Sequence, residues 1–290
     1  MKFYLRSAKL EIGDGTTIKT IDDLKIMFTV TKQFTASLNT AEIIVYNLSE
    51  SSRNQITEEF TKVKLFAGYD NDLPLIFQGD LVNATHLKDQ TEWVTTILAS
   101  DGFKAFKGTI NQSLPAGTTM PEAVSIVSDK LEGVTKGVRQ GLTNCLSGKK
   151  SILRQVQLSG NLKDAFTKLS KTCGFDFSVN DEKFETTSPG QPITDVQPVI
   201  INQANGMIGS PERTEIGVNV SVLLTPSLLV GRRIQIKSQT ERVNFGNGFF
   251  RKIPSIKNEG IYRIQKLVFK GDTRGDTWVT DIVANSFTAS

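Results

Sequence analysis

Hydrophobic and polar residues alternate along roughly the first hundred positions of the chain, in short runs that polar turns separate. The alternating positions of successive runs are Ile26, Phe28 and Val30; Ala41, Ile43 and Val45; Val63, Leu65 and Ala67; Leu75 and Phe77; and Trp93, Thr95, Ile97 and Ala99. Because successive side chains of a strand point to opposite faces, this period of two predicts half-buried β-strands. The same alternation returns from Ile216 towards the end of the chain.

Helical signals interrupt the strand pattern. Ser49 can cap a short helix in which Ile56 and Phe60 lie four residues apart on one face. Apolar residues at helical spacing follow Pro121, and a further helix is predicted from its cap, Asn161, to Gly174. The stretch 181–215 is rich in Pro, Gly, Asn and Gln, which predicts a connector that runs over the surface.

These patterns predict a mainly β fold with an α+β insertion: two similar tube-like β-barrel domains in one chain plus a small α/β domain. We expect the first barrel domain in residues 1–103, the α/β insertion in 104–185, a linker in 186–205 and the second barrel domain in 206–290. A chain of 290 residues has room for about two or three domains of ordinary size.

The sequence of one predicted strand occurs twice in the chain with few changes. Residues 91–100 read TEWVTTILAS and residues 276–285 read DTWVTDIVAN, 185 positions later, centred on the only two tryptophans. The duplicated strand comprises Trp93, Val94, Thr95 and Ile97 in one copy and Trp278, Val279, Thr280 and Ile282 in the other. Phe77 and Tyr262 each precede their tryptophan by sixteen residues, which predicts hairpins of one length. The spacing favours duplicated domains, although β-branched and aromatic residues also make good strand sequence by coincidence.

The chain offers little for catalysis or metal binding. His86 is the only histidine, Cys145 and Cys173 lack metal-ligand spacing, and neither a G-x-S-x-G motif nor a phosphate-binding glycine motif occurs. We therefore expect no enzyme activity, no cofactor and no metal, although two carboxylates could hydrolyse glycosides without any motif. Two cysteines also make no disulfide framework, which favours a reducing compartment.

No segment has the apolar length of a membrane span. The longest apolar stretch, Val218 to Val230, is interrupted by polar residues and a proline, and it falls short of the ~20 apolar residues that a span needs. Arg6 and Lys9 interrupt the start of the chain before a signal-peptide core could form. We expect neither a membrane span nor export by that route.

Charge is distributed unevenly. Gly231 to Arg274 holds eleven Lys or Arg against three Asp or Glu. Such a segment fits a nucleic-acid face, a dock for an acidic protein, or simply the solvated side of strands. Its loop, Gln239 to Asn258, carries a candidate partner interface of aromatic and cationic residues. These residues are Phe245, Phe249, Phe250, Arg251 and Lys252.

The alternative function is a nucleic-acid-binding β-barrel that uses the basic 231–274 region. Phosphates would meet Arg232, Arg233, Arg251, Lys252 and Lys257, and bases would stack on Phe249 or Phe250.

The chain resembles the bacteriophage tail and baseplate hub proteins, the late-control-D-like family related to the hub part of type VI secretion spike proteins. In the first barrel region the resemblance rests on Val45-Tyr46-Asn47-Leu48-Ser49, Ala67-Gly68-Tyr69, Ile76-Phe77-Gln78-Gly79 and Ala99-Ser100-Asp101-Gly102. In the second it rests on Gly206-Met207-Ile208-Gly209-Ser210-Pro211, Leu224-Thr225-Pro226-Ser227-Leu228 with Gly231, and Gly260-Ile261-Tyr262-Arg263-Ile264.

The resemblance implies a structural protein of the virion tail, assembled in the host bacterial cytoplasm. It implies a homotrimeric ring of pseudo-sixfold symmetry that joins the hexameric tail tube, or a distal tail protein, to a trimeric central spike protein. The ring would leave a channel for the tape measure protein and for genomic DNA.

Overall fold

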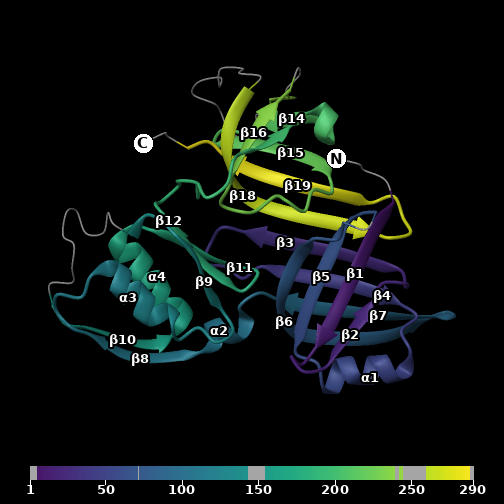
Figure 1. Cartoon of the computed structure of the whole chain (residues 1–290), viewed down its shortest axis with the longest axis horizontal. Helices are drawn as coiled ribbons and strands as arrows, with labels where there is room; N and C mark the ends of the chain where they lie inside the picture. The colour runs from purple at the N-terminus through teal and green to yellow at the C-terminus, as the bar shows by residue number, and fades with distance from the viewer. Residues whose placement is uncertain (1–4, 71, 143–153, 239–241, 244–258, 288–290) are drawn as a thin grey trace.

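The structure is a computed structural model that describes residues 5–70, 72–142, 154–238, 242–243 and 259–287. It is mainly β, with 52% strand and 16% helix, and one 14-stranded sheet dominates it (Figure 1). In sheet order the strands are β17 (Arg242–Val243), β14 (Met207–Arg213), β15 (Gly217–Leu223), β19 (Trp278–Asn285), β18 (Glu259–Asp272), β3 (Ile26–Gln33), β4 (Thr40–Tyr46), β7 (Glu92–Ser100), β6 (Leu75–Asp89), β5 (Lys62–Tyr69), β1 (Arg6–Gly13) and β2 (Ile18–Ile21), with β16 (Arg233–Lys237) beside β18 and β13 (Val199–Ile201) beside β16.

The sheet consists of two units that share one order of strands. The first unit, residues 6–100, has the order β3-β4-β7-β6-β5-β1, and the second unit, residues 199–285, has the order β14-β15-β19-β18-β16-β13. Matching pairs run in the same relative direction except at the end, where β1 is antiparallel to β5 and β13 is parallel to β16. Hydrogen bonding continues between the units because β3 pairs with β18.

The expected pair of tube-like barrels is corrected by this sheet, because the described strands form one open sheet and no closed barrel. The cause lies in the long strand β18. On one edge its first residues pair with β16 and its later residues pair with β3, so the second unit runs on into the first. The domain boundaries remain predictions. The range expected to be a linker, 186–205, contributes β13 to the sheet and buries Ile193.

The α/β insertion, which lies between the two units in sequence, is at the lower left of Figure 1. Its elements are α2 (Phe103–Lys107), β8 (Thr109–Leu114), α3 (Met120–Ser128), β9 (Thr135–Arg139), β10 (Val156–Asn161), α4 (Leu162–Cys173), β11 (Asp176–Asn180) and β12 (Lys183–Thr187). Strands β8 and β10 pair with each other, and β12 lies between β11 and β9. Phe166, Phe177 and Phe184 belong to a core that is separate from the one shared by both sheet units.

The helix starts predicted from the sequence are confirmed, but Phe60, expected on the face of the first helix, lies beyond its last residue, Glu58. Helix α1 (Glu50–Glu58) begins after Ser49, whose hydroxyl oxygen accepts a hydrogen bond from the Ser52 N–H. Helix α4 begins after Asn161, which caps it in the same way, and ends at Gly174 with a φ of 65°, a left-handed conformation that glycine adopts without strain. A short 3-10 turn, η2 (Gln203–Asn205), precedes β14.

Candidate assembly interface

The duplicated strand occupies equivalent places in the two units. In the first unit it is β7, between β4 and β6; in the second it is β19, between β15 and β18. The long strand beside it has an irregularity at the same register, between Leu81 and Asn83 in β6 and between Ile264 and Lys266 in β18. Threonines and isoleucines of both copies are buried in the shared core, and both valines face the other side, half-buried. These residues are Thr95, Ile97, Thr280 and Ile282, and Val94 and Val279.

The two tryptophans differ in what covers them. Trp278 is fully buried and packs edge-to-face on Phe28 of β3, with ring centroids 5.5 Å apart. Trp93 is half-buried, and the centroid of its ring lies 3.9 Å from the guanidinium carbon of Arg53 on α1. Trp278 is therefore covered by the first unit, whereas Trp93 is contacted by a helix of its own unit.

The hairpins are not of one length, which corrects the expected match of Phe77 with Tyr262. Lys88 pairs with Trp93 five positions later, whereas Gly271 pairs with Trp278 seven positions later. The second turn is two residues longer, so Tyr262 corresponds in register to Gly79. A surface turn can lengthen without disturbing the strands that it joins, and sequence spacing across it therefore misleads.

The two units are joined by the pairing of β18 with β3. It covers seven residue pairs, from Lys266 opposite Gln33 to Asp272 opposite Met27. The turn after β18 adds a hydrogen bond, because the hydroxyl of Thr273 accepts from the Ile26 N–H at 3.0 Å. The same kind of pairing that builds each unit thus also joins the two.

The two strands that correspond to this joint, β6 and β14, each have an edge that is largely unpaired among the described residues. Strand β6 corresponds to β18, and from Val82 onwards no strand among the described residues pairs with its edge away from β7. Strand β14 corresponds to β3, and within the described ranges its edge away from β15 carries the two residue pairs of β17. Leu87 on β6 is 69% exposed and Ile208 on β14 is 42% exposed. Each chain therefore has one free edge that corresponds to the β18 side of the joint and one that corresponds to the β3 side. Both could pair with a second copy of the chain.

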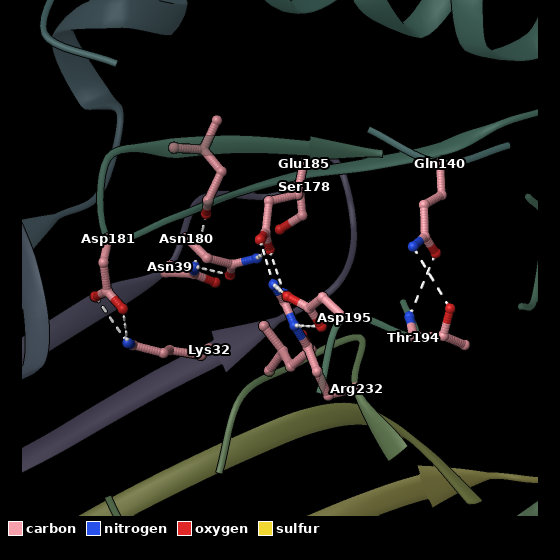
Figure 2. Close-up of polar contacts among 12 residues, drawn as sticks. Lys32, Asn39, Gln140, Ser178, Asn180, Asp181, Glu185, Thr194, Asp195 and Arg232 are labelled. Atoms are coloured by element: carbon pink, nitrogen blue, oxygen red, sulfur yellow. Dashed lines mark hydrogen bonds and ion pairs between the residues drawn. The ribbon is translucent and has the colours of Figure 1, made fainter. Parts of the chain in front are cut away.

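A network of buried charges fixes the insertion against both units (Figure 2). Arg232, which precedes β16, binds Glu185 of β12 through two hydrogen bonds of 2.5 Å and Asp195 at 2.8 Å. Burial disfavours the charged guanidinium, but the hydrogen bonds and charges of the two carboxylates outweigh it and raise the pKa of Arg232. A second buried arginine, Arg263 of β18, pairs with Asp176 at 3.1 Å.

The β11–β12 turn reaches the first unit in the same way. Its two residues, Asp181 and Glu182, have φ of 51° and 59°, which is a strained conformation for residues other than glycine. Asp181 accepts hydrogen bonds from the Lys32 ammonium at 2.6 and 2.7 Å, and Glu182 pairs with Lys62. Burial opposes the charge of Lys62, yet Glu182 and Asp80 raise its pKa on balance. These bonds hold the turn in place despite the strained conformation of its backbone.

Asp101 lies beneath this turn and is fully buried. Its Oδ1 accepts a hydrogen bond from the Glu182 N–H at 3.0 Å, while its Oδ2 has no hydrogen-bond partner among the described residues. Burial, and next the charge of Asp181, raise the pKa of Asp101 to about 7. The carboxyl therefore changes its protonation near neutral pH inside the contact between insertion and sheet.

No sequence motif marks this network, and our sequence reasoning missed it. The one available signal was the pair of acidic residues in a polar turn between two strands. Arg232 belongs to the basic segment that we considered for nucleic acid, but it is buried and paired inside the chain. That removes one of the phosphate contacts on which the nucleic-acid alternative rests.

The candidate partner interface, Phe245, Phe249, Phe250, Arg251 and Lys252, lies outside the described residues. Within the described ranges, no helix has the length and apolar character to cross a membrane. In those same ranges, no three His, Cys, Asp or Glu side chains come together in a way that could hold a metal ion.

The fold is that of solved phage tail proteins. A tail protein from Neisseria meningitidis MC58 has a TM-score of 0.63 at 9% identity, covering 98% of this chain and 97% of its own. The 43 kDa tail protein of prophage MuSo2 from Shewanella oneidensis has a TM-score of 0.62 at 10% identity over 96% of each chain. The E. coli c3393 protein, a type VI secretion component described as structurally similar to the T4 bacteriophage tail proteins gp27 and gp5, has a TM-score of 0.61 at 13% identity, covering 96% of this chain and 77% of its own.

No curated protein matches the sequence. The profile of the baseplate hub gp41 family, in contrast, matches residues 6–246. That range holds the first unit, the insertion and the second unit as far as β17. The fold and this match agree, and the chain belongs to the baseplate hub gp41 family.

Proposed function

We propose that this protein is the structural hub of a phage tail baseplate or tail tip. Three copies form a ring of pseudo-sixfold symmetry that joins the hexameric tail tube, or a distal tail protein, to the trimeric central spike. The channel of the ring takes the tape measure protein and later the genomic DNA. The protein works in the virion tail, is assembled in the host bacterial cytoplasm, and performs no catalysis.

The observation that carries this proposal is the joint of β18 with β3, together with the open edges that match it. The edge of β6 corresponds to the edge of β18, and the edge of β14 corresponds to the edge of β3. A second copy can therefore repeat between chains the pairing that exists within one. Three chains of two units make a cycle of six units, in which the inner and outer joints alternate and the free edges of β6 and β14 are all paired.

The internal joint also predicts the register between copies. Lys270 lies opposite Thr29 at the joint, and by strand correspondence Leu87 of one copy lies opposite Glu212 of the next. In the same way Phe269 opposite Val30 places His86 opposite Arg213. This pairing would cover the exposed Leu87, and it would bring β14 of the next copy beside the half-buried Trp93.

The symmetry of the ring explains why each chain contains two similar units. A hexameric tube and a trimeric spike cannot match residue for residue, whereas three doubled chains present six similar units on one side and three whole chains on the other. The family match supports this role. A chain of the Francisella PdpA-VgrG complex shares the fold at 7% identity and a TM-score of 0.52, and the match covers 58% of that chain.

A cysteine pair at the predicted register tests the ring. We expect Leu87→Cys with Glu212→Cys to yield, on mild oxidation, a covalent species of three chains, because each copy contributes one cysteine to each of two joints. Electrophoresis without reductant and light scattering measure the product. The matched control is Leu87→Cys with Arg213→Cys, since Arg213 is one residue further along β14 and points to the opposite face.

Two results would contradict the proposal. One is a chain that stays monomeric at every concentration, also with tube and spike proteins present. The other is an open ladder of dimers, tetramers and longer species, because a ring of three leaves no free cysteine at its ends. Equal cross-linking of the control pair would reject the register but not the ring.

A further inference from the structure

One face of the large sheet is exposed to solvent in both units. Side chains alternate along each strand, and those of the opposite face form the shared core. On this solvent face, Leu98 of β7 is 41% exposed, and the equivalent residue of the repeated strand, Val283 of β19, is 38% exposed. The solvent face continues across the joint between the units. One cross-strand row of it consists of Leu223, Val279, Lys270, Thr29, Glu42 and Leu98.

The second layer of strands lies on the core side of this sheet. Strands β1 and β5 fold back across β4 and β7 (Figure 1), and Leu10 and Leu65 pack into one core with Ile43 and Ile97. In the second unit, Ile234 of β16 belongs to the same core. Within the described residues, each unit therefore carries its second layer on the core side.

Closing the sheet into the proposed ring places one of its two faces on the inside. A second layer packs about 10 Å from the first, and the layer further from the axis has the longer circumference. Six units have room for their second layers when these layers lie outside the ring. The solvent face is then the inner face.

The solvent face carries more carboxylates than cations. We counted its positions in the described strands β3, β4, β7, β15 and β19, in β6 from Asn83 onwards and in β18 from Lys266 onwards. Two lysines, Lys266 and Lys270, stand against five carboxylates, and Lys270 already pairs with Asp281 at 2.9 Å. The five carboxylates are Glu42, Asp89, Glu92, Asp272 and Asp281.

This composition favours one class of occupant over another. A nucleic acid is bound through lysines and arginines that neutralise its phosphates, and the solvent face has no such excess. Exposed apolar residues that recur in both units are typical of a contact with protein. A polypeptide with basic side chains between apolar ones matches both the carboxylates and the exposed Leu98 and Val283.

We propose that the solvent face is the wall of the channel and that it binds a polypeptide in which basic side chains lie between apolar ones. This inference rests on the proposed ring and adds the face that lines it and the class of molecule that this face contacts. DNA passes along the same wall without being held, because the carboxylates repel its phosphates.

Cysteine labelling tests the position of the wall. In the dilute monomer, Leu98→Cys should react with a small maleimide and with a maleimide that carries a long polyethylene glycol chain. In the trimer, we expect the large reagent to react several-fold more slowly and the small one to remain fast. Thr20→Cys is the control, because Thr20 is exposed on β2 and faces away from the core. The parent protein, with Cys145 and Cys173, gives the background.

Binding of model ligands to the trimer tests the occupant. The probes are a fluorescent peptide of lysine and leucine, the same peptide with glutamate in place of lysine, and a short DNA duplex. We expect the basic peptide to bind, and Glu42→Lys to weaken its binding several-fold in fluorescence anisotropy. Glu132→Lys makes the same change of charge at an exposed position of the insertion and should leave the binding unchanged.

The outcomes separate the wall, its occupant and the ring. A trimer in which Leu98→Cys stays open to the large reagent would overturn the wall and leave the ring intact. DNA that binds more tightly than the basic peptide, or equal effects of Glu42→Lys and Glu132→Lys, would overturn the polypeptide as occupant. If light scattering finds no trimer even with tube and spike proteins present, the ring is rejected and the wall with it.

Discussion

At the scale of single residues, the environment of Asp101 strongly favours its protonated form. Burial, and then the neighbouring Asp181, raise its pKa to about 7, whereas an aspartate in the unfolded chain titrates near 4. Between these values the folded protein holds a proton that the unfolded chain has lost. The free energy of unfolding therefore falls as pH rises through this window, and the loss is complete above the folded pKa.

Asp101→Asn should remove most of this pH dependence, because the amide stays neutral and keeps the oxygen that accepts from the Glu182 N–H. Above pH 7 we expect the stability of the variant relative to the parent to be up to about 4 kcal/mol higher than at pH 4, from a pKa shift of about three units. Chemical denaturation at several pH values measures it. Asp22→Asn, at an exposed position, is the control. Parallel pH profiles of Asp101→Asn and the parent would contradict the assignment.

At the scale of elements, the equivalent hairpins β6–β7 and β18–β19 lie in different environments. At equivalent positions opposite their tryptophans, β6 has Lys88 and β18 has Gly271. The lysine is exposed, while the glycine lies under Phe28 and Trp278, where an added Cβ would come within 2.3 Å of the Phe28 ring. The difference follows from the joint, which covers the second hairpin within the chain.

Gly271→Ala should therefore destabilise the joint. Phe28 and Trp278 must move to admit a methyl group, and overpacking of this kind costs about 1 to 3 kcal/mol. Lys88→Ala, at the equivalent exposed position of the first hairpin, should change the free energy of unfolding by less than about 0.5 kcal/mol. Denaturant titration of both variants measures the contrast. Similar effects at both positions would mean that the joint does not crowd Gly271.

At the scale of the whole molecule, ion pairs between the insertion and the sheet units hold the insertion in place. The carboxylates come from residues 176–195 and the cations from the sheet units. The pairs are Asp176 with Arg263, Asp181 with Lys32, Glu182 with Lys62, and Glu185 and Asp195 with Arg232. Because the two sheet units share one core and the insertion has its own, these contacts fix how the insertion sits on the ring that we propose.

Arg232→Leu should destabilise the protein by about 3 to 5 kcal/mol, because it leaves the buried Glu185 without its cation. Adding Glu185→Leu should restore a large part of the loss, since no buried charge then remains unpaired at β12. A denaturation cycle of the parent, both single variants and the double variant measures the coupling. Lys136→Ala at the exposed Lys136–Asp129 pair is the control, with an expected loss below about 1 kcal/mol. A double variant as unstable as Arg232→Leu would contradict the argument.

Local features were predictable from the sequence because they depend on neighbours in the chain. The alternation gave the inward faces of Ile43 and Ile97, and the caps Ser49 and Asn161 located two helix starts. Spacing across a turn was not reliable, as Tyr262 and Phe77 illustrate, because turn length varies independently of strand register. The ion pairs of Arg232 could not be predicted, since Glu185 lies 47 positions away and no local pattern selects it.

The sequence by itself determined the elements, the repeated strand and the family likeness, because period, capping and motif are properties of short segments. Only the tertiary structure decided that β18 pairs with β3, so that the strands described in the two units form one open sheet and no closed barrel. Strand pairing between distant segments depends on which edges are left free once each unit has folded. An edge is a property of the assembled sheet, and no single strand carries it in its sequence.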